Sequence, residues 1–200
     1  MKKKVCIFIT AFMVLVTLSG CATNASNTKV FVPSTEITVI SRENGSGTRG
    51  AFIELLGIEE KDEKGNKKDR TTDEAVISNS TSVVMTSVAS NPYAIGYISL
   101  GSLNDTVKAV KVDGIEATAE NIKKGYYVVS RPFNIATRVD VSDLAKDFIN
   151  FILSTEGQKV VEENGYISIS GTEGFSSTKL SGKIVVAGSS SVTPVMEKLK

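Results

Sequence analysis

The sequence contains no histidine and no tryptophan, and only two cysteines and four prolines among its 200 residues. Without histidine the chain has no Ser-His-Asp triad, no histidine general base and no histidine-ligated zinc site. These absences exclude most hydrolase mechanisms. The charge is nearly balanced, with 23 basic and 22 acidic residues, so the basic excess typical of nucleic-acid-binding proteins is lacking. No nucleic-acid partner is expected.

The first twenty residues have the pattern of a secretion signal. Residues 2–4 are lysines, residues 5–18 form an apolar run, and Leu18-Ser19-Gly20-Cys21 ends it with small side chains. About 14 apolar residues are too few to cross a bilayer, which needs roughly 20. The pattern therefore predicts a signal peptide over residues 1–20 instead of a transmembrane anchor.

Leu-Ser-Gly-Cys also resembles the lipobox of bacterial lipoproteins, whose cysteine is lipidated and becomes the mature N-terminus. The resemblance makes Cys21 the expected lipid anchor, and several acyl chains hold a protein stably on a membrane. Residues 21–36 are polar and lack periodicity, as a tether would. Cys6 leaves with the signal, so no thiol remains for a disulfide, a metal or catalysis. The mature chain carries 20 basic against 22 acidic residues, because three lysines and no acid are removed.

Strand-like and helix-like segments alternate along the remainder of the chain, which predicts the α/β class. Strands are expected at 37–41, 94–100, 107–112, 126–130 and 183–187. Helices are expected at 51–56, in the second half of 73–90, at 117–124, 143–153 and 155–163, and from Thr193 onward. The mixed-charge stretch 59–70 is expected to be a solvated excursion, and the Gly/Ser/Thr-rich residues 170–182 a linker.

The most informative stretch is residues 42–50, Arg-Glu-Asn-Gly-Ser-Gly-Thr-Arg-Gly, between an expected strand and an expected helix. A helix N-terminus exposes unpaired N–H groups, and Gly47 lets the backbone approach a ligand. Ser46 and Thr48 add hydroxyl donors, and Arg42 offers a fork that matches two oxygens of an oxyanion. The pattern indicates an anion-binding loop.

Other interpretations of this loop remain open. Gly45-x-Gly47-x-x-Gly50 matches a dinucleotide fingerprint, but no second strand ending in an acid follows. A Walker loop would need a lysine where Thr48 stands. The loop could also be a tight turn with no ligand.

Residues 37–52, ITVISRENGSGTRGAF, closely resemble the second lobe of the phosphate-binding proteins of ABC-type phosphate importers. That family carries an arginine followed four residues later by Ser-Gly-Thr, here Arg42, Ser46, Gly47 and Thr48. The similarity continues through residues 91–97, Arg131-Pro132 and residues 148–167, so that it covers residues 37–169. The resemblance implies a periplasmic-binding-protein-like (type II) fold with two lobes, of which this chain holds an incomplete copy.

The last segment, IVVAGSSSV at 184–192, resembles the opening strand and phosphate loop of that family's first lobe. The resemblance adds Ser190, Ser191 and Val192 to the expected phosphate-binding residues. In an ordinary member this segment precedes the Arg-Ser-Gly-Thr motif, whereas here it follows. A tandem or truncated gene is the favoured account, with a second-lobe module at 37–169 and the start of a first-lobe module at 183–200. A circular permutation is the other account, and it would let the last segment dock on its own chain.

The resemblance implies extracytoplasmic capture of inorganic phosphate, delivery to the permease subunits of an ABC importer, and attachment to the membrane through the lipid anchor. No reaction, cofactor or metal is expected. The family's first lobe also supplies a serine and a proton-accepting aspartate that have no counterpart here. Alternatives are therefore a lipoprotein sensor or decayed duplicate that binds another oxyanion or no ligand, and an enzyme that binds a nucleotide at the glycine-rich loop.

Overall fold

The computed structural model describes residues 31–178 and 180–200, so the signal sequence and Cys21 lie outside the described residues. The chain divides into a unit of residues 1–34 and a compact unit of residues 35–200. The helices and strands described below belong to the second unit. In the described residues no helix is long and apolar enough to cross a membrane.

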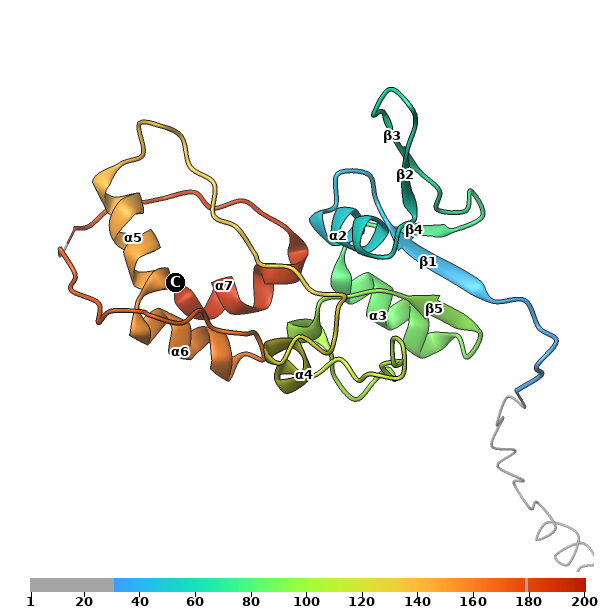
Figure 1. Cartoon of the computed structure of the whole chain (residues 1–200). Helices are drawn as coiled ribbons and strands as arrows, with labels where there is room; N and C mark the ends of the chain where they lie inside the picture. Colours follow the sequence, from blue (N-terminus) through green and yellow to red (C-terminus); the bar gives the residue numbers. More distant parts are fainter. Residues whose placement is uncertain (1–30, 179) are drawn as a thin grey trace, which may run out of the picture. The chain divides into compact units, whose positions relative to one another are not determined.

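Three short parallel strands form the sheet that organises the first half of this unit (Figure 1). They are β1 (Thr38–Arg42), β4 (Val76–Ser78) and β5 (Ala94–Gly96), in the order β4-β1-β5. The β-branched residues of β1 favour a strand, and its position between two neighbours buries Ile40 to 3% exposure. Since the strands are parallel, their carboxyl ends share one edge, where Arg42 lies in register with Ser78.

Two helices pack beside this sheet. Helix α3 (Thr81–Ser90) contacts β5 and β1, with Val84 only 1% exposed. A Cβ atom at Gly96 would lie 2.8 Å from Val84 Cγ1, so the close approach of helix and strand requires glycine there. Helix α2 (Gly47–Leu55) follows β1, and its Phe52 ring stacks on Tyr97 with centroids 4.0 Å apart. Both helices begin next to the sheet edge that carries Arg42.

The mixed-charge stretch forms a regular hairpin. Strands β2 (Glu59–Lys61) and β3 (Lys67–Asp69) pair antiparallel. The turn between them has Gly65 at a positive φ of 80°, and Asp62 accepts hydrogen bonds from Asn66. The expectation of a solvated stretch is confirmed, because these residues are mostly exposed, but the hairpin itself was not expected.

The second half is mainly helical. Its elements are η2 (Leu100–Ser102), α4 (Ala119–Lys123), α5 (Asp143–Leu153), α6 (Thr155–Glu163), η3 (Ser190–Val192) and α7 (Thr193–Leu199). Tyr166, Val195 and Leu199 form a buried apolar cluster against which side chains of α5 and α6 pack. The expected cap of α5 is confirmed, since Ser142 accepts a hydrogen bond from the Ala145 N–H. Helix α7 is thereby held against α6 of the same chain.

Several expected strands do not form in the part of the chain that the structure describes. Residues 126–130 and 183–187 contain no strand, 107–112 contributes only a bridge from Val112 to Ile115, and the strand expected at 94–100 ends at Gly96. Val128 and Val185 are 65% and 88% exposed. A strand needs a neighbour for its backbone hydrogen bonds, and these segments have none. The three-residue β4 was missed, because its apolar pattern is too short to stand out.

Candidate functional site: an oxyanion cradle at the carboxyl edge of the sheet

The loop between β1 and α2, residues 42–50, is called the arginine loop here. Gly45 takes a φ of 83°, which favours glycine and turns the chain sharply after β1. Ser46 then caps α2 by accepting a hydrogen bond from the Arg49 N–H. The N–H groups of Gly47 and Thr48, in the first turn of α2, have no hydrogen-bond partner among the described residues. These two donors and the helix dipole favour an anion at this point.

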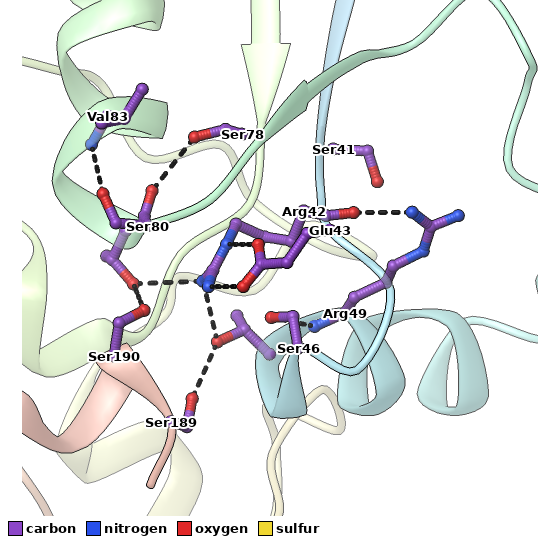
Figure 2. A network of polar contacts seen from close by, with 12 residues as sticks. Ser41, Arg42, Glu43, Ser46, Arg49, Ser78, Ser80, Val83, Ser189 and Ser190 are labelled. Atoms are coloured by element: carbon purple, nitrogen blue, oxygen red, sulfur yellow. Dashed lines mark hydrogen bonds and ion pairs between the residues drawn. The ribbon is translucent and has the colours of Figure 1, made fainter. Parts of the chain in front are cut away.

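The Arg42 side chain lies buried at the centre of the site, with its residue 2% exposed (Figure 2). Its Nε and Nη2 each donate to the Glu43 carboxylate over 2.9 Å. Its Nη1 donates to the hydroxyls of Thr48 and Thr81, both at 3.4 Å. The hydrogen bonds from Arg42 hold the pKa of the Glu43 carboxyl below its ordinary value. The guanidinium is therefore paired on one edge and faces hydroxyl groups on another.

Two side chains hydrogen-bond to the backbone of Arg42 and hold it in place. The Tyr97 hydroxyl accepts a hydrogen bond from the Arg42 N–H over 3.0 Å and shares another with Ser41 over 2.8 Å. The Arg49 Nη1 donates to the Arg42 carbonyl over 2.6 Å, and its Nε pairs with Asp69 over 2.8 Å. Asp69 lies at the end of β3, so the charged hairpin is tied to the arginine loop.

A second loop, residues 188–192, meets the first and is called the serine turn here. Ser191 hydrogen-bonds Thr48 through their hydroxyls, and Ser189 lies 3.4 Å from the same Thr48 oxygen. Ser190 shares a hydrogen bond of 3.2 Å with Thr81 at the start of α3. A Cβ atom at Gly47 would lie 3.4 Å from Ser189 Cβ. Residues about 140 positions apart are thus brought into contact.

The serine turn is anchored by Tyr166, whose hydroxyl donates to the Ser191 carbonyl over 2.6 Å. Val192 differs from the other expected site residues in its contacts. Its N–H donates to the Ser189 carbonyl over 3.1 Å, and its side chain packs on the apolar cluster around Val195. The Val192 amide is therefore used inside the turn in this conformation.

A cavity of about 460 Å³ opens where the two loops meet. Arg42, Ser46, Gly47 and Ser190 line it, whereas Thr48 and Ser191 bond each other beside it. Sequence reasoning missed four contributors to the site, namely Glu43, Asn79, Thr81 and Ser189. The polar run at 78–81 is the signal that could have found two of them, because a parallel sheet gathers its ligand contacts at the carboxyl ends of its strands.

The described side chains contain no group of three or more histidine, cysteine, aspartate or glutamate residues that could hold a metal. The site offers a guanidinium, several hydroxyls and two free amides, which are the donors that a tetrahedral oxyanion requires. The parallel sheet with flanking helices places the chain in the α/β class, and the donors at its carboxyl edge form a candidate oxyanion site.

The chain belongs to the PBP superfamily, whose domain matches residues 18–156. The phosphate-binding protein PstS 2 of Streptococcus agalactiae is 54% identical over 184 residues, which cover 92% of this chain and 61% of that protein. PstS 2 of Streptococcus pneumoniae is 49% identical over 184 residues, 91% of this chain and 62% of that protein. The expected family and the α/β periplasmic-binding-protein-like fold are thereby confirmed.

Solved structures agree with this assignment. A phosphate-binding protein of a phosphate ABC transporter from Streptococcus pneumoniae is 51% identical with a TM-score of 0.66, over 82% of this chain and 64% of that one. A putative phosphate ABC transporter substrate-binding protein with bound phosphate from Clostridium perfringens is 42% identical with a TM-score of 0.59, over 67% and 52% of the two chains. The chain thus spans less than two thirds of the length of these relatives.

Proposed function

We propose that this chain captures inorganic phosphate outside the cytoplasm and delivers it to the permease subunits of an ABC-type importer, without a chemical reaction. The observation that carries the proposal is the convergence of Arg42, the N-terminus of α2 and the serine turn on one cavity. The names of the relatives at 49 to 54% identity support phosphate as the ligand.

Phosphate would replace water with hydrogen bonds from the arginine loop on one side and the serine turn on the other. Arg42, Ser46, Gly47 and Thr48 are the proposed ligands of the first loop, and Ser190 and Ser191 those of the second. Thr48 and Ser191 are paired with each other in the structure, so their hydroxyls would turn toward the anion when it binds. Val192 would need to release its amide from Ser189 before it could contribute.

The test is an NMR titration of the chain with inorganic phosphate, sulfate and a nucleotide, read at the amides of Gly47 and Thr48. Phosphate is expected to shift both signals, with weak affinity, because the family's proton-accepting aspartate has no counterpart in this chain. Shifts produced only by the nucleotide would contradict the proposal. Submicromolar phosphate binding would show that the pocket is complete and that the interpretation of a missing first-lobe contribution is wrong.

The domain order is also proposed. Residues 183–200 correspond to the start of a first lobe and dock on the site of residues 37–169 within one chain, with residues 170–182 as the linker. The docking of the serine turn on Thr48 and Thr81 supports a rearranged order over the tandem account favoured from the sequence alone. Size-exclusion chromatography of the chain with the linker cleaved would test the docking, since the last segment should stay bound.

Cys21 is proposed as the lipidated mature N-terminus, with residues 21–36 as the tether. Leu18-Ser19-Gly20-Cys21 at the end of a short apolar run supports this anchor. Mass spectrometry of the membrane fraction from a bacterial host is expected to show a diacylglyceryl group on Cys21. An unmodified peptide that spans residues 13–21 in the mature protein would contradict it.

A further inference from the structure

The pair between Arg42 and its neighbour Glu43 is unusual in its placement. Both carboxylate oxygens accept a hydrogen bond from one edge of the guanidinium, at 2.9 Å from Nε and 2.9 Å from Nη2. The Arg42 side chain is 3% exposed, whereas the Glu43 side chain is 36% exposed. The arginine is therefore fixed in the interior, and its partner reaches into the site from the solvent side.

The Glu43 carboxylate fills the Nε/Nη2 edge of Arg42 within the cavity. It lines the same cavity as Ser46, Gly47 and Ser189, and it covers the edge of Arg42 that is suited to bidentate binding of a carboxylate or phosphate. Figure 2 shows it beside the guanidinium, with Ser46 close by. Among the described side chains, Arg42 is its one hydrogen-bond partner. The backbone N–H of Glu43 itself and the charge of Arg49 act on the carboxylate as well.

The pair has a physical reason when no anion is bound at the site, because Arg42 then needs a counter-charge. A guanidinium that is almost fully buried is costly without a counter-charge, because desolvation removes the stabilisation by water. Glu43 supplies that charge when no anion is bound. An incoming anion brings its own negative charge, so the carboxylate then becomes both a competitor for the Nε/Nη2 edge and a source of repulsion.

We propose that Glu43 is a built-in competitor, which neutralises Arg42 in the empty protein and must leave the Nε/Nη2 edge when an oxyanion binds. Glu43 thereby lowers the affinity for oxyanions and discriminates among them. A singly charged anion of the size of a carboxylate would gain too little binding free energy to displace the Glu43 side chain. This inference rests on the proposed function, because it concerns the same site. It adds a specificity-determining residue that the sequence pattern did not indicate.

The experiment is a titration with inorganic phosphate, followed by ¹⁵N-edited NMR at Gly47, Thr48 and the Arg42 Nε–H, of the chain and its Glu43→Gln variant. Glutamine has the same size but carries no charge, so we expect at least about tenfold tighter binding, which corresponds to about 1.4 kcal/mol. Glu43→Asp keeps the charge on a shorter side chain and should lie between the two. The Arg42 Nε–H of the unliganded variant should exchange faster with water.

Glu54→Gln is the matched control. Glu54 lies on α2 and pairs with Arg131 over 3.0 Å at the surface, so the substitution removes the same charge from an arginine pair outside the site. Its phosphate affinity should stay within about twofold of the parent, because an exposed pair contributes little. If Glu54→Gln tightened phosphate binding as much as Glu43→Gln does, the effect would come from the net charge of the chain alone, and the inference would be overturned.

Weaker or unchanged phosphate binding by Glu43→Gln would also overturn it, and weaker binding would make Glu43 a residue that positions Arg42. In both cases phosphate still binds the parent chain, so the proposed function stands. If neither protein binds phosphate, the proposed function and the competitor role fall together. Binding by the variant alone supports both.

Discussion

The arginine loop and the serine turn contribute to one cavity, yet they are held in different ways. The arginine loop is fixed by its own strand, its own helix cap and a contact from Tyr97, the residue after strand β5. The serine turn has no strand before it and depends on Tyr166 and on hydroxyl contacts with α2 and α3. Both loops have long-range contacts, but the arginine loop also has a strand, a glycine turn and a helix cap of its own, whereas the serine turn is placed mainly by packing.

This difference in how the loops are held determines what each loop can contribute to the proposed anion site. The strand, turn, helix cap and Tyr97 contact of the arginine loop do not depend on the serine turn, so we expect the arginine loop to supply the fixed part of the proposed cradle. The position of the serine turn depends on the packing of the apolar cluster of Tyr166, Val195 and Leu199. Substitutions in that cluster should therefore move the serine turn and leave the arginine loop unchanged, which makes the comparison testable.

The largest expected effect is on anion binding by Arg42 variants. Arg42→Ala removes the charged donor, and Arg42→Lys keeps the charge but loses the planar fork. Both substitutions should weaken phosphate binding by at least roughly tenfold, about 1.4 kcal/mol, in an NMR or calorimetric titration. Unchanged affinity in Arg42→Ala would move the site away from the arginine loop.

Paired glycine substitutions contrast the two regions directly. A Cβ at Gly101 would overlap the Tyr166 ring, so Gly101→Ala should displace the tyrosine that anchors the serine turn and destabilise the fold by about 1–3 kcal/mol. Gly50→Ala, inside α2, meets nothing within 4 Å and should stabilise the helix by up to about 1 kcal/mol. Urea unfolding measures both. A neutral Gly101→Ala would show that the packing around Tyr166 is loose.

Tyr166→Phe tests the anchor of the serine turn with a smaller change. The ring stays in the apolar cluster, but the hydroxyl that donates to the Ser191 carbonyl is lost. The free energy of unfolding should fall by about 1 kcal/mol, as for other hydrogen bonds. NMR should show shifted amide signals for Ser190 and Ser191 and unchanged signals for Gly47. Equal shifts in both loops would contradict their independence.

The smallest effect is expected at the salt bridge that ties the hairpin to the arginine loop. Burial raises the pKa of Asp69, but hydrogen bonds from Thr71 and Arg49 outweigh it and hold the pKa below its ordinary value. The ionised carboxylate therefore stabilises the fold fully above that ordinary value of 3.8, and this contribution is lost as the pH falls through the lowered folded-state pKa.

Asp69→Asn should accordingly destabilise the chain by less than about 1 kcal/mol at neutral pH. The difference from the parent should shrink as the pH falls below 3.8, in urea unfolding measured across that range. A difference that stays constant with pH would show that the pair does not contribute through its charge.

The sequence was sufficient to predict the elements whose residue pattern is local and repeated. The apolar spacing predicted α5, α6 and the start of α7, and Ser142 was identified as a cap. The expected anion loop is also local, since Gly45 supplies the turn and Ser46 the cap of α2. Strands were predicted less well, because β-branched runs such as 126–130 and 183–187 become strands only beside a partner.

By itself the sequence indicated the α/β class and the arginine loop, because short-range spacing encodes a strand, a turn and a helix start, and its resemblance to known proteins indicated the family. Only the tertiary structure decided that the serine turn lies against Thr48 and Thr81, that Tyr166 anchors it, and that Glu43 covers Arg42. Those contacts join residues that are distant in the chain or select one of several side-chain directions. They follow from how the helices and the sheet pack, which no local pattern specifies.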